Sequence, residues 1–244
     1  MKKVTIITPT VGSQELFKCI KSVSEQTYEN VEHMIVVDGK EFWEKSKEII
    51  ETVDYNKLEL YLPQNVGSGG WYGHRVYAAT SYLINSDYVM FLDQDNWLDE
   101  DHVAKCVETL ESHDYDWVFS LRSIHEPNGT FICNDNCESL GAWATWVSLI
   151  QGSPNSHIDT SCFFIKREVL VSVAGAWYGQ YGQDRIFFHH LSKYYPNFSC
   201  TGYNTLNYRL GGNPGSVTKE FFLQGNEYMR NKYGNKFPWE NDIS

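Results

Sequence analysis

The sequence predicts an α/β protein with a mostly parallel central sheet flanked by helices, followed by a smaller mixed region. Strand-like and helix-like segments alternate four times along the first half, with short links between them. This alternation is typical of a parallel sheet whose right-handed crossovers place helices on both faces. A second observation is the apolar and aromatic run 88–92, which leads directly into Asp93 and Asp95. Such a run predicts a strand buried on both faces, with two carboxylates at its carboxyl end.

The first half supplies the four strands and helices. Each predicted strand is an apolar, often β-branched run that stops at a proline or an aspartate. The first helix carries apolar residues at helical spacing with Ser13 as its N-cap, and the second begins with acid, as the helix dipole favours. Asn96 and Asp99 are expected to cap the fourth. The strands are predicted at 4–8, 31–37, 58–62 and 88–92, and the later three helices at 41–53, 72–84 and 99–111.

The second half breaks this rhythm. Strands at 116–122 and 131–133 flank the turn 126–129, whose Pro-Asn-Gly sequence predicts a hairpin. Residues 139–154 are rich in Trp and Gly and predict a short helix with a substrate-facing loop. Because no repeat or linker separates the halves, we expect one domain over residues 1–244. The remaining strands are predicted at 160–166 and 198–208, and the helices at 167–174, from 185 onward and at 217–233.

Composition argues against several classes of protein. The net charge of -11 and the pI near 5.1 disfavour a nucleic-acid binder, because neutralising phosphates needs a basic face. No apolar run approaches the ~20 residues that span a bilayer, and the N-terminus lacks a signal-peptide core. Six scattered cysteines suit reduced thiols in the cytoplasm. Cys133 and Cys137 lie near His125 and Asp135, but no second cysteine pair completes a zinc site.

Three predicted strand ends finish in polar residues. They are Thr8-Pro9-Thr10, Asp38-Gly39 and Asp93-Gln94-Asp95. Because the carboxyl ends of parallel strands converge at one edge of a sheet, we expect these segments to line one ligand site. Neighbouring carboxylates disfavour each other's ionisation, and a divalent metal carrying phosphate oxygens is the simplest cation to relieve this. Taken alone, Asp95 suits a helix cap equally well, and Asp-Gly suits a turn.

A glycine-rich loop, residues 64–75, precedes the third predicted helix. It matches neither the dinucleotide fingerprint nor the phosphate loop that ends in Gly-Lys-Ser/Thr. Its place before His74 and Arg75 favours a lid over a diphosphate, where the helix N-terminus and Arg75 would supply positive potential. For Arg75 alone, a surface ion pair is an equal alternative.

Later segments hold further candidates. Asp184 stands at the start of a predicted helix, where an N-cap is the simpler interpretation of an isolated acid. His189 and His190, further along this helix, suit ordinary packing better than contact with a metal or diphosphate. The glycines within 208–213 predict a mobile loop that closes over the bound ligand, with Arg209 as a candidate diphosphate contact.

Five motifs follow one another in a fixed order. They are Ile7-Thr-Pro-Thr10, Val36-Val-Asp-Gly39, Asn65-Val-Gly67 with Gly73-His-Arg75, Phe91-Leu-Asp-Gln-Asp95 and Gly182-Gln-Asp-Arg185. Together they resemble the family 2 glycosyltransferases of the GT-A fold, over about residues 3–195. The resemblance implies a nucleotide-sugar-binding half over about residues 1–98 and an acceptor-binding, catalytic half over about 99–244.

The resemblance also implies roles for single residues. Asp93 would face the ribose and is a weaker candidate for the metal, Asp95 would hold Mn²⁺ or Mg²⁺ on the diphosphate, and Asp184 would be the catalytic base. Gln183 departs from the family's commoner Glu, and His74-Arg75 replaces the commoner Arg-Asn. The nucleotide-binding set would be Thr8, Pro9, Thr10, Asp38, Gly67 and Arg75, and the weaker candidates are His74, Gln94, Gln183, Arg185, His189, His190 and Arg209.

The implied reaction is metal-dependent, inverting transfer from a nucleotide-diphosphate sugar, above all a UDP-sugar, to a hydroxyl of a glycan or other acceptor. A single base opposite the leaving group predicts a β-linkage from an α-linked donor. The resemblance suggests polysaccharide biosynthesis in the cytoplasm or at its membrane surface. Two alternatives stay open. They are a sugar-nucleotide-binding protein without turnover and a nucleotidyltransferase, which would usually carry Lys or Arg after the first strand, where residues 10–14 have none.

Overall fold

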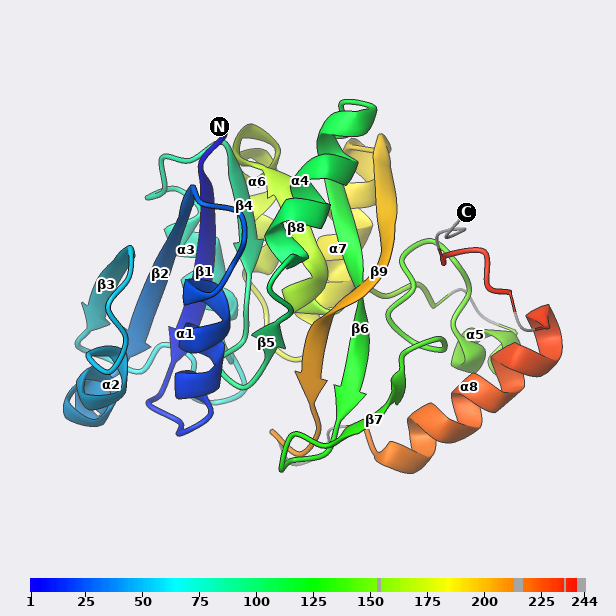
Figure 1. Cartoon of the computed structure of the whole chain (residues 1–244), viewed down its shortest axis with the longest axis horizontal. Helices are drawn as coiled ribbons and strands as arrows, with labels where there is room; N and C mark the ends of the chain where they lie inside the picture. Colours follow the sequence, from blue (N-terminus) through cyan, green and yellow to red (C-terminus); the bar gives the residue numbers. More distant parts are fainter. Residues whose placement is uncertain (153–154, 213–216, 235, 241–244) are drawn as a thin grey trace.

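A computed structural model describes residues 1–152, 155–212, 217–234 and 236–240. Its strands are β1 (Val4–Thr10), β2 (Val31–Asp38), β3 (Lys57–Leu62), β4 (Tyr88–Phe91), β5 (Trp97–Leu98), β6 (Trp117–His125), β7 (Phe131–Asn134), β8 (Phe163–Lys166) and β9 (Phe198–Arg209). Within these residues they form one sheet in the order β3-β2-β1-β4-β8-β6-β9-β5, with β7 paired to β6 (Figure 1). The sheet therefore runs through both halves of the sequence.

The first four strands are parallel, as the alternation of strands and helices predicts. β1 lies between β2 and β4, and β2 pairs with β3. The register aligns Thr10 at the end of β1 with Val37 near the end of β2. All four residues of β4 are buried, which confirms that the run after residue 87 is an inner strand. The carboxyl ends of these strands thus reach one edge of the sheet.

The remaining strands are mixed in direction. β8 pairs antiparallel with both β4 and β6, and β9 runs parallel to β6. The predicted hairpin is confirmed by β6 and β7, whose turn is closed by a hydrogen bond from the Gly129 amide to the Glu126 carbonyl at 2.8 Å. No local pattern predicts β5, because it is two residues long and pairs with β9 from much later in the chain.

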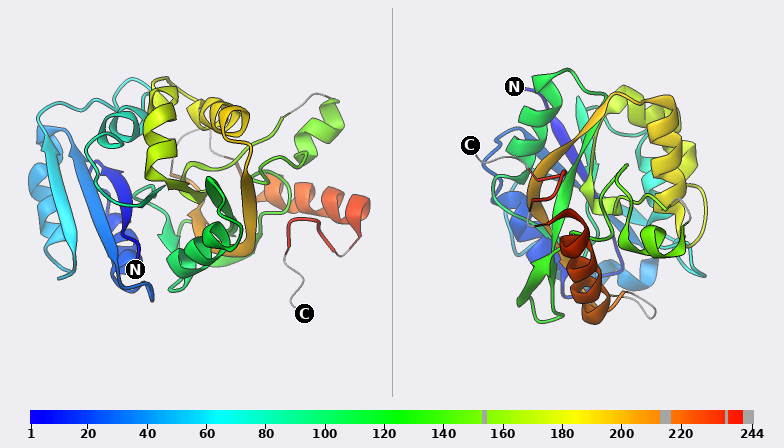
Figure 2. Two further views of the ribbon diagram at one scale, coloured as in Figure 1. Left: turned by 90° about the horizontal axis from the view of Figure 1, so that it is seen from above. Right: turned by 90° about the vertical axis from the view of Figure 1, so that its right-hand side faces the viewer.

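Helices cover both faces of the sheet. The α-helices are α1 (Leu16–Ser24), α2 (Trp43–Ile50), α3 (His74–Thr80), α4 (His102–Ser112), α5 (Trp146–Gln151), α6 (Arg167–Val173), α7 (Gln183–Tyr194) and α8 (Lys219–Tyr233), with 3-10 turns η1 (Lys40–Phe42), η2 (Thr160–Cys162) and η3 (Ala174–Trp177). Helices α1, α2 and α4 lie on one face, and α3, α6 and α7 on the other (Figure 1 and Figure 2). α5 and α8 contact each other beyond the mixed end of the sheet.

The predicted cap of α1 is wrong. Glu15 occupies the N-cap position, and the Ser13 hydroxyl donates to the Glu15 carboxylate rather than accepting from the helix. Helices α2 and α3 are also shorter than predicted, because the chain turns after Ile50 and after Thr80 before entering the next strand. The local sequence pattern identifies the positions of these helices but predicts both of them to be longer than they are.

The predicted caps of α4 are wrong as well. This helix begins without a side-chain cap. The Asn96 amide instead donates to the Ser161 hydroxyl at 3.2 Å, and the Asp99 carboxylate accepts from the Asn207 amide at 2.8 Å. Both side chains therefore tie the segment after β4 to distant parts of the chain, and these bonds satisfy their polar atoms.

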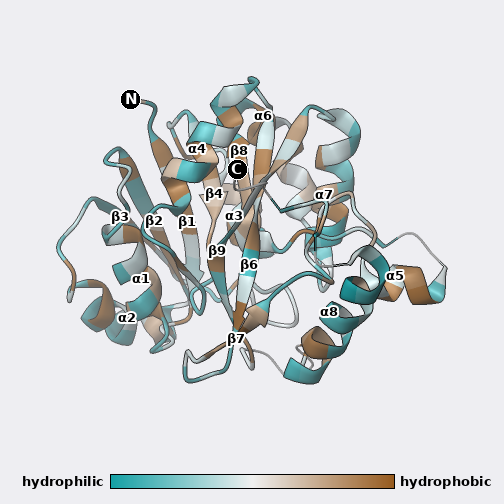
Figure 3. Cartoon of the chain, turned by 45° about the vertical axis from the view of Figure 1, so that its right-hand side comes forward, coloured by the Kyte–Doolittle hydropathy of each residue, from teal (hydrophilic) through white to brown (hydrophobic). Residues whose placement is uncertain are grey.

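Apolar packing holds the two halves together. Trp177 of η3 packs edge-to-face on Phe91 of β4 with ring centroids 5.2 Å apart and stacks on Phe187 of α7 at 4.2 Å. All three rings are fully buried, and the arrangement fixes the start of α7 against the sheet. Figure 3 shows hydrophobic residues gathered along the central strands. None of the helices within the described ranges is long and apolar enough to cross a membrane.

The histidine and aspartate that lie near Cys133 in the sequence have hydrogen-bond partners of their own. All six cysteines lie in the described ranges and are free thiols. His125 contacts Asn207 at 2.8 Å, and Asp135 accepts from Arg122 at 2.8 Å. The side chains that lie near Cys133 in the sequence are therefore used in separate hydrogen bonds.

Candidate active site

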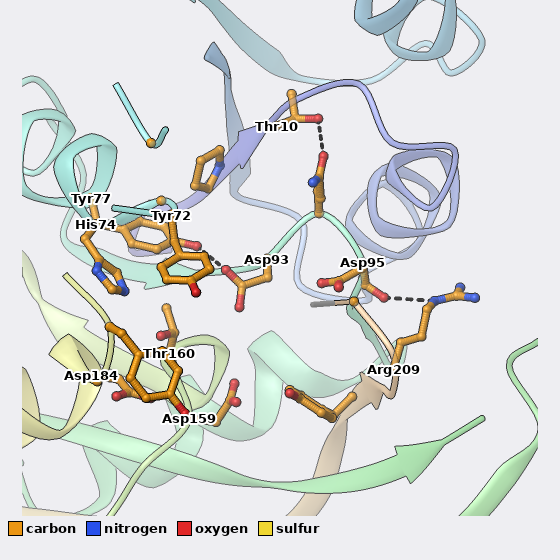
Figure 4. A pocket seen from close by; sticks show the side chains of 18 of the residues that line it. Thr10, Tyr72, His74, Tyr77, Asp93, Asp95, Asp159, Thr160, Asp184 and Arg209 are labelled. Atoms are coloured by element: carbon orange, nitrogen blue, oxygen red, sulfur yellow. Dashed lines mark hydrogen bonds between the residues drawn. The ribbon is translucent and has the colours of Figure 1, made fainter. Parts of the chain in front are cut away.

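One cavity lies at the carboxyl ends of β1, β2 and β4. Its volume is about 460 Å³, and segments from both halves of the chain surround it (Figure 4). The structure thus confirms that the three polar strand ends converge. The predicted site residues that line the cavity are Pro9, Thr10, Asp38, Gly67, His74, Asp93, Gln94, Asp95, Asp184, Arg185 and Arg209.

Gln94 joins the ends of β1 and β4. Its side-chain oxygen accepts from the Thr10 hydroxyl at 2.7 Å and from the Val11 amide at 3.1 Å. The side chain of Gln94, which lies between Asp93 and Asp95 in the sequence, therefore fastens the loop that carries these two acids. This tether fixes Asp93 and Asp95 relative to the end of β1.

Asp38 holds the glycine-rich loop at the end of β2. Its two carboxylate oxygens accept from the backbone amides of Val66 and Gly67, each at 2.8 Å. A Cβ atom at Gly67 would lie 2.2 Å from the Tyr72 carbonyl oxygen and 2.8 Å from Asp38 Oδ2. Only glycine permits this close approach of the loop to its own later turn.

Replacing Gly67 by Ala should displace the loop from Asp38. We expect a loss of about 1–3 kcal/mol in the free energy of unfolding, as for other overpacked sites, because neither backbone oxygen nor carboxylate can yield by the required distance. Urea denaturation measures this loss. The matched control is Gly175→Ala, where the added methyl meets no atom within 4 Å. Equal stability of the two variants would contradict the prediction.

Asp93 and Asp95 lie in surroundings that disfavour their negative charges. Asp93 accepts a hydrogen bond from the Tyr77 hydroxyl at 2.6 Å, yet burial, together with the charges of Asp95 and Asp159, raises its pKa to about 7. Burial likewise raises the pKa of Asp95 to about 6. A cation between such carboxylates would stabilise their ionised forms.

Asp184 faces these acids from the opposite wall of the cavity, in the first turn of α7 (Figure 4). The helix begins at Gln183 after Gly182, so Asp184 is not its N-cap, and that alternative interpretation is wrong. One carboxylate oxygen accepts from the Arg185 amide at 2.8 Å. Burial raises the pKa of Asp184, which suits a group that must accept a proton near neutral pH.

Gln183 is turned toward the protein interior and does not line the cavity. Its side-chain nitrogen donates to the Ala176 carbonyl and so links α7 to η3. A glutamate, the commoner residue in the family, has no donor to offer at this position when ionised. Gln183 thus makes a hydrogen bond that an ionised glutamate could not make.

The sequence analysis missed a buried ionic cluster in the wall formed by β6. Arg122 donates to Asp135 at 2.8 Å and to Asp159 at 2.7 Å, and also to Glu138. Only 1% of Arg122 is exposed, and Arg122, Glu138 and Asp159 all line the cavity. An arginine within the apolar run of β6 is the signal that points to such a cluster, because a buried charge requires partners.

Thr8 and Arg75 do not line the cavity. The Thr8 hydroxyl is buried and contacts the ring of His33 at 2.8 Å. Arg75 stacks on Trp71, with its guanidinium carbon 3.5 Å from the ring centroid, and donates to the Val66 carbonyl at 3.2 Å. Arg75 thus braces the glycine-rich loop from behind rather than projecting over the cavity. It also forms no ion pair with the described residues.

Of the other weaker candidates, some line the cavity and others do not. His189 and His190 are exposed on α7 and lie outside the cavity lining. His74 lines the cavity, and its Nδ1 atom contacts the Gly179 carbonyl at 2.9 Å, which assigns the proton to that nitrogen. Arg185 lines it as well and lies 3.8 Å from a carboxylate oxygen of Glu138.

The end of β9 and the residues that follow it border the cavity beside Asp95. Arg209 donates from Nε to the Asp95 carbonyl at 3.2 Å (Figure 4). A Cβ atom at Gly212 would lie 2.2 Å from the Asp95 carboxylate, so glycine is needed for this approach. Residue 213 of the predicted mobile loop, like residues 153 and 154 of the predicted segment 139–154, lies outside the described residues.

Comparison with known proteins relates the chain to sugar-transferring enzymes. The model of the glycosyl transferase family 2 matches residues 5–173. Glycosyltransferase GlyA of Streptococcus pneumoniae serotype 4 is 28% identical over 140 residues, which cover 53% of this chain and 18% of that protein. The chain thus spans less than a fifth of the length of this curated relative.

Solved structures share the fold at low identity. S. aureus TarS 1–349 in complex with UDP has a TM-score of 0.64, and the complex with UDP-GlcNAc has a TM-score of 0.61. Both are 15% identical, and the matches cover 96% of this chain and 66% and 67% of those chains. The likeness confirms the predicted GT-A type α/β fold.

Proposed function

Because the chain belongs to the glycosyl transferase family 2, we propose that it moves a sugar from a nucleotide-diphosphate sugar, specifically a UDP-sugar, to a hydroxyl of a glycan or other acceptor. The observation that carries the proposal is the convergence of Asp93, Asp95 and Asp184 on one cavity, beside the ends of β1 and β2. The TarS structures contain UDP and UDP-GlcNAc in a fold of the same kind, which supports a uridine donor.

The nucleoside would bind between the ends of β1 and β2. Pro9 and Thr10 border this part of the cavity, and the loop at Gly67 is held there by Asp38. Both Asp38 oxygens already accept backbone amides, so its main contribution would be to shape the pocket. Asp93, fixed by Tyr77, would meet the ribose.

The donor set suits a hard divalent cation. Asp95, with Asp93 as the second candidate, offers carboxylate oxygens, which Mn²⁺ and Mg²⁺ prefer. Among the residues that the structure describes, no group of three or more His, Cys, Asp or Glu side chains could hold a metal. Diphosphate oxygens and water would therefore complete the coordination. Such an ion would neutralise the charge of the departing diphosphate.

Asp184 would act on the acceptor. The acceptor oxygen forms a bond to the anomeric carbon while the bond from that carbon to the diphosphate breaks, and Asp184 takes the hydroxyl proton. Asp184 lies across the cavity from Asp93 and Asp95 (Figure 4), so attack would come from the face opposite the leaving group. The anomeric centre would then invert, giving a β-linkage from an α-linked donor.

A thermal-shift experiment tests donor and metal together. We expect saturating UDP with Mn²⁺ to raise the melting temperature by about 5–10 °C, because a ligand at 100 times its Kd adds about 2.7 kcal/mol to the folded state. UDP after removal of divalent ions should give a much smaller shift. Asp95→Asn should lose the Mn²⁺-dependent part of the shift.

The matched control is Asp54→Asn, which changes an exposed aspartate outside the cavity and should keep the full shift. A shift that is the same with and without Mn²⁺ would remove the metal role of Asp95. No shift with any nucleotide sugar would remove the proposed donor class.

A further inference from the structure

A buried histidine faces the proposed catalytic base. His157 is 5% exposed and lines the cavity. Its Nδ1 atom lies 3.7 Å from a carboxylate oxygen of Asp184. This nitrogen is shielded from solvent and has no hydrogen-bond partner among the described residues. An unpaired polar atom inside a protein is costly, so its position calls for an explanation.

The backbone around His157 is fixed on both sides. Its carbonyl accepts from the Gly141 amide at 2.9 Å. Two residues later, Asp159 caps η2 through the Ser161 amide and accepts from Arg122. The backbone of His157 is therefore held in place, so the ring stays beside Asp184 and adjusts only by rotation about its own side-chain bonds.

Asp184 has one oxygen to spare. Its Oδ1 atom accepts from the Arg185 amide, and its Oδ2 atom is the one that faces His157. A carboxylate oxygen has two lone pairs. One pair on Oδ2 can accept from His157 while the other accepts the acceptor hydroxyl. Closing the gap to a normal hydrogen bond requires a movement of about 1 Å, and catalytic hydrogen bonds often tighten only when substrate binds.

We propose that His157 is a positioning residue. Its Nδ1–H group donates a hydrogen bond to Oδ2 of Asp184 and so orients that oxygen toward the acceptor hydroxyl. The inference rests on the proposed function only in naming Asp184 as the base. No proton transfer to His157 is required, because the imidazole remains neutral while Asp184 takes the proton.

The surrounding charges agree with a neutral donor. Burial lowers the pKa of His157 to about 4, with Glu138 and Asp159 opposing this effect and Arg122 and Arg185 adding to it. Burial raises the pKa of Asp184, which Arg185, His74 and Arg122 partly offset. At pH 7 the imidazole is therefore uncharged and carries one N–H, while Asp184 gains from any donor that stabilises its ionised form.

The test is the pKa of Asp184 itself, measured by NMR on protein with ¹³C-labelled aspartate carboxyls. Asp184→Asn assigns the resonance, and the pair His157→Asn and His157→Gln separates the two roles of the side chain. The Asn amide stands at the level of Nδ1 and can still donate to Asp184, whereas the Gln amide extends past it. His190→Asn, exposed on the same helix as Asp184, is the matched control.

We expect His157→Gln to raise the pKa of Asp184 by about one unit, as loss of one hydrogen bond to a carboxylate does, and His157→Asn to restore most of the difference. In transfer assays His157→Gln should lower kcat about tenfold at pH 7 and leave KM for the donor unchanged. An identical pKa for Asp184 in all the variants would overturn the positioning role. Failure of every donor to react would overturn the proposed function, while the pKa comparison would still decide the hydrogen bond.

Discussion

Asp184→Asn is expected to slow sugar transfer by about 10²–10⁴-fold and to leave UDP binding unchanged. The amide keeps the shape of the side chain but cannot accept a proton, and a general base contributes a factor of this size. The side chain lies across the cavity from the residues that would hold the nucleotide. The ratio of kcat values therefore measures its role, and calorimetry with UDP measures binding separately.

The pH dependence gives a second test of Asp184. Because burial raises its pKa and only the ionised carboxylate accepts a proton, kcat should rise with pH through a pKa above the ordinary aspartate value. This rise of kcat with pH should be absent in Asp184→Asn. Asp54→Asn, which changes an exposed residue, serves again as the control and should retain both the wild-type kcat and its rise with pH. If Asp184→Asn kept full activity with every donor, the base would have to be another residue.

Arg122→Met is expected to cause the largest loss of stability, about 3–5 kcal/mol in the free energy of unfolding. The change leaves Asp135, Glu138 and Asp159 beside one another without their shared cation, and breaking a buried ion pair by removing one partner costs about this much. Asp135 is fully buried and Arg122 is 1% exposed, so solvent cannot replace the lost charge. Urea unfolding at pH 7 measures the difference.

Arg122→Lys separates charge from geometry. It retains the cation but lacks the fork that reaches three carboxylates, so we expect an intermediate loss. Burial alone would raise the pKa of Asp135, but Arg122 and the backbone amides of Cys137 and Ser139 hold it below its ordinary value. This pair therefore contributes stability above the unfolded pKa of aspartate, and the contribution disappears as pH falls through the lower, folded pKa. The difference between wild type and Arg122→Met should therefore narrow on acidification. A constant difference would show that the loss comes from packing.

The sequence predicts the part of the cavity formed by the ends of β1, β2 and β4 better than the opposite wall. The strands β1, β2 and β4 are apolar runs that stop at polar residues. Parallel pairing then brings Thr10, Asp38 and Asp95 to one edge without any knowledge of side-chain contacts. This part of the site depends on local pattern and a general rule of sheet geometry.

The opposite wall depends on residues that are distant from one another in the sequence. Arg122 finds Asp135 and Asp159 only after β6, β8 and the segments between them have assembled. His157 gains significance only when α7 places Asp184 beside it. Local patterns suggested caps for Asn96 and Asp99, yet tertiary hydrogen bonds take both. A pattern of neighbouring residues cannot predict such contacts, because the partners are far apart in the sequence.

The order of strands in the sheet has a consequence for synthesis on the ribosome. The pairs among β1, β2, β3 and β4 need only residues 4–91, so this half can assemble while the rest of the chain is still being translated. β6 can pair with β7 early, but its two neighbours in the main sheet, β8 and β9, come later in the chain, and β9 ends at Arg209. A nascent chain would therefore form β1, β2 and β4, whose ends line the cavity, before α7 brings Asp184 to the opposite wall.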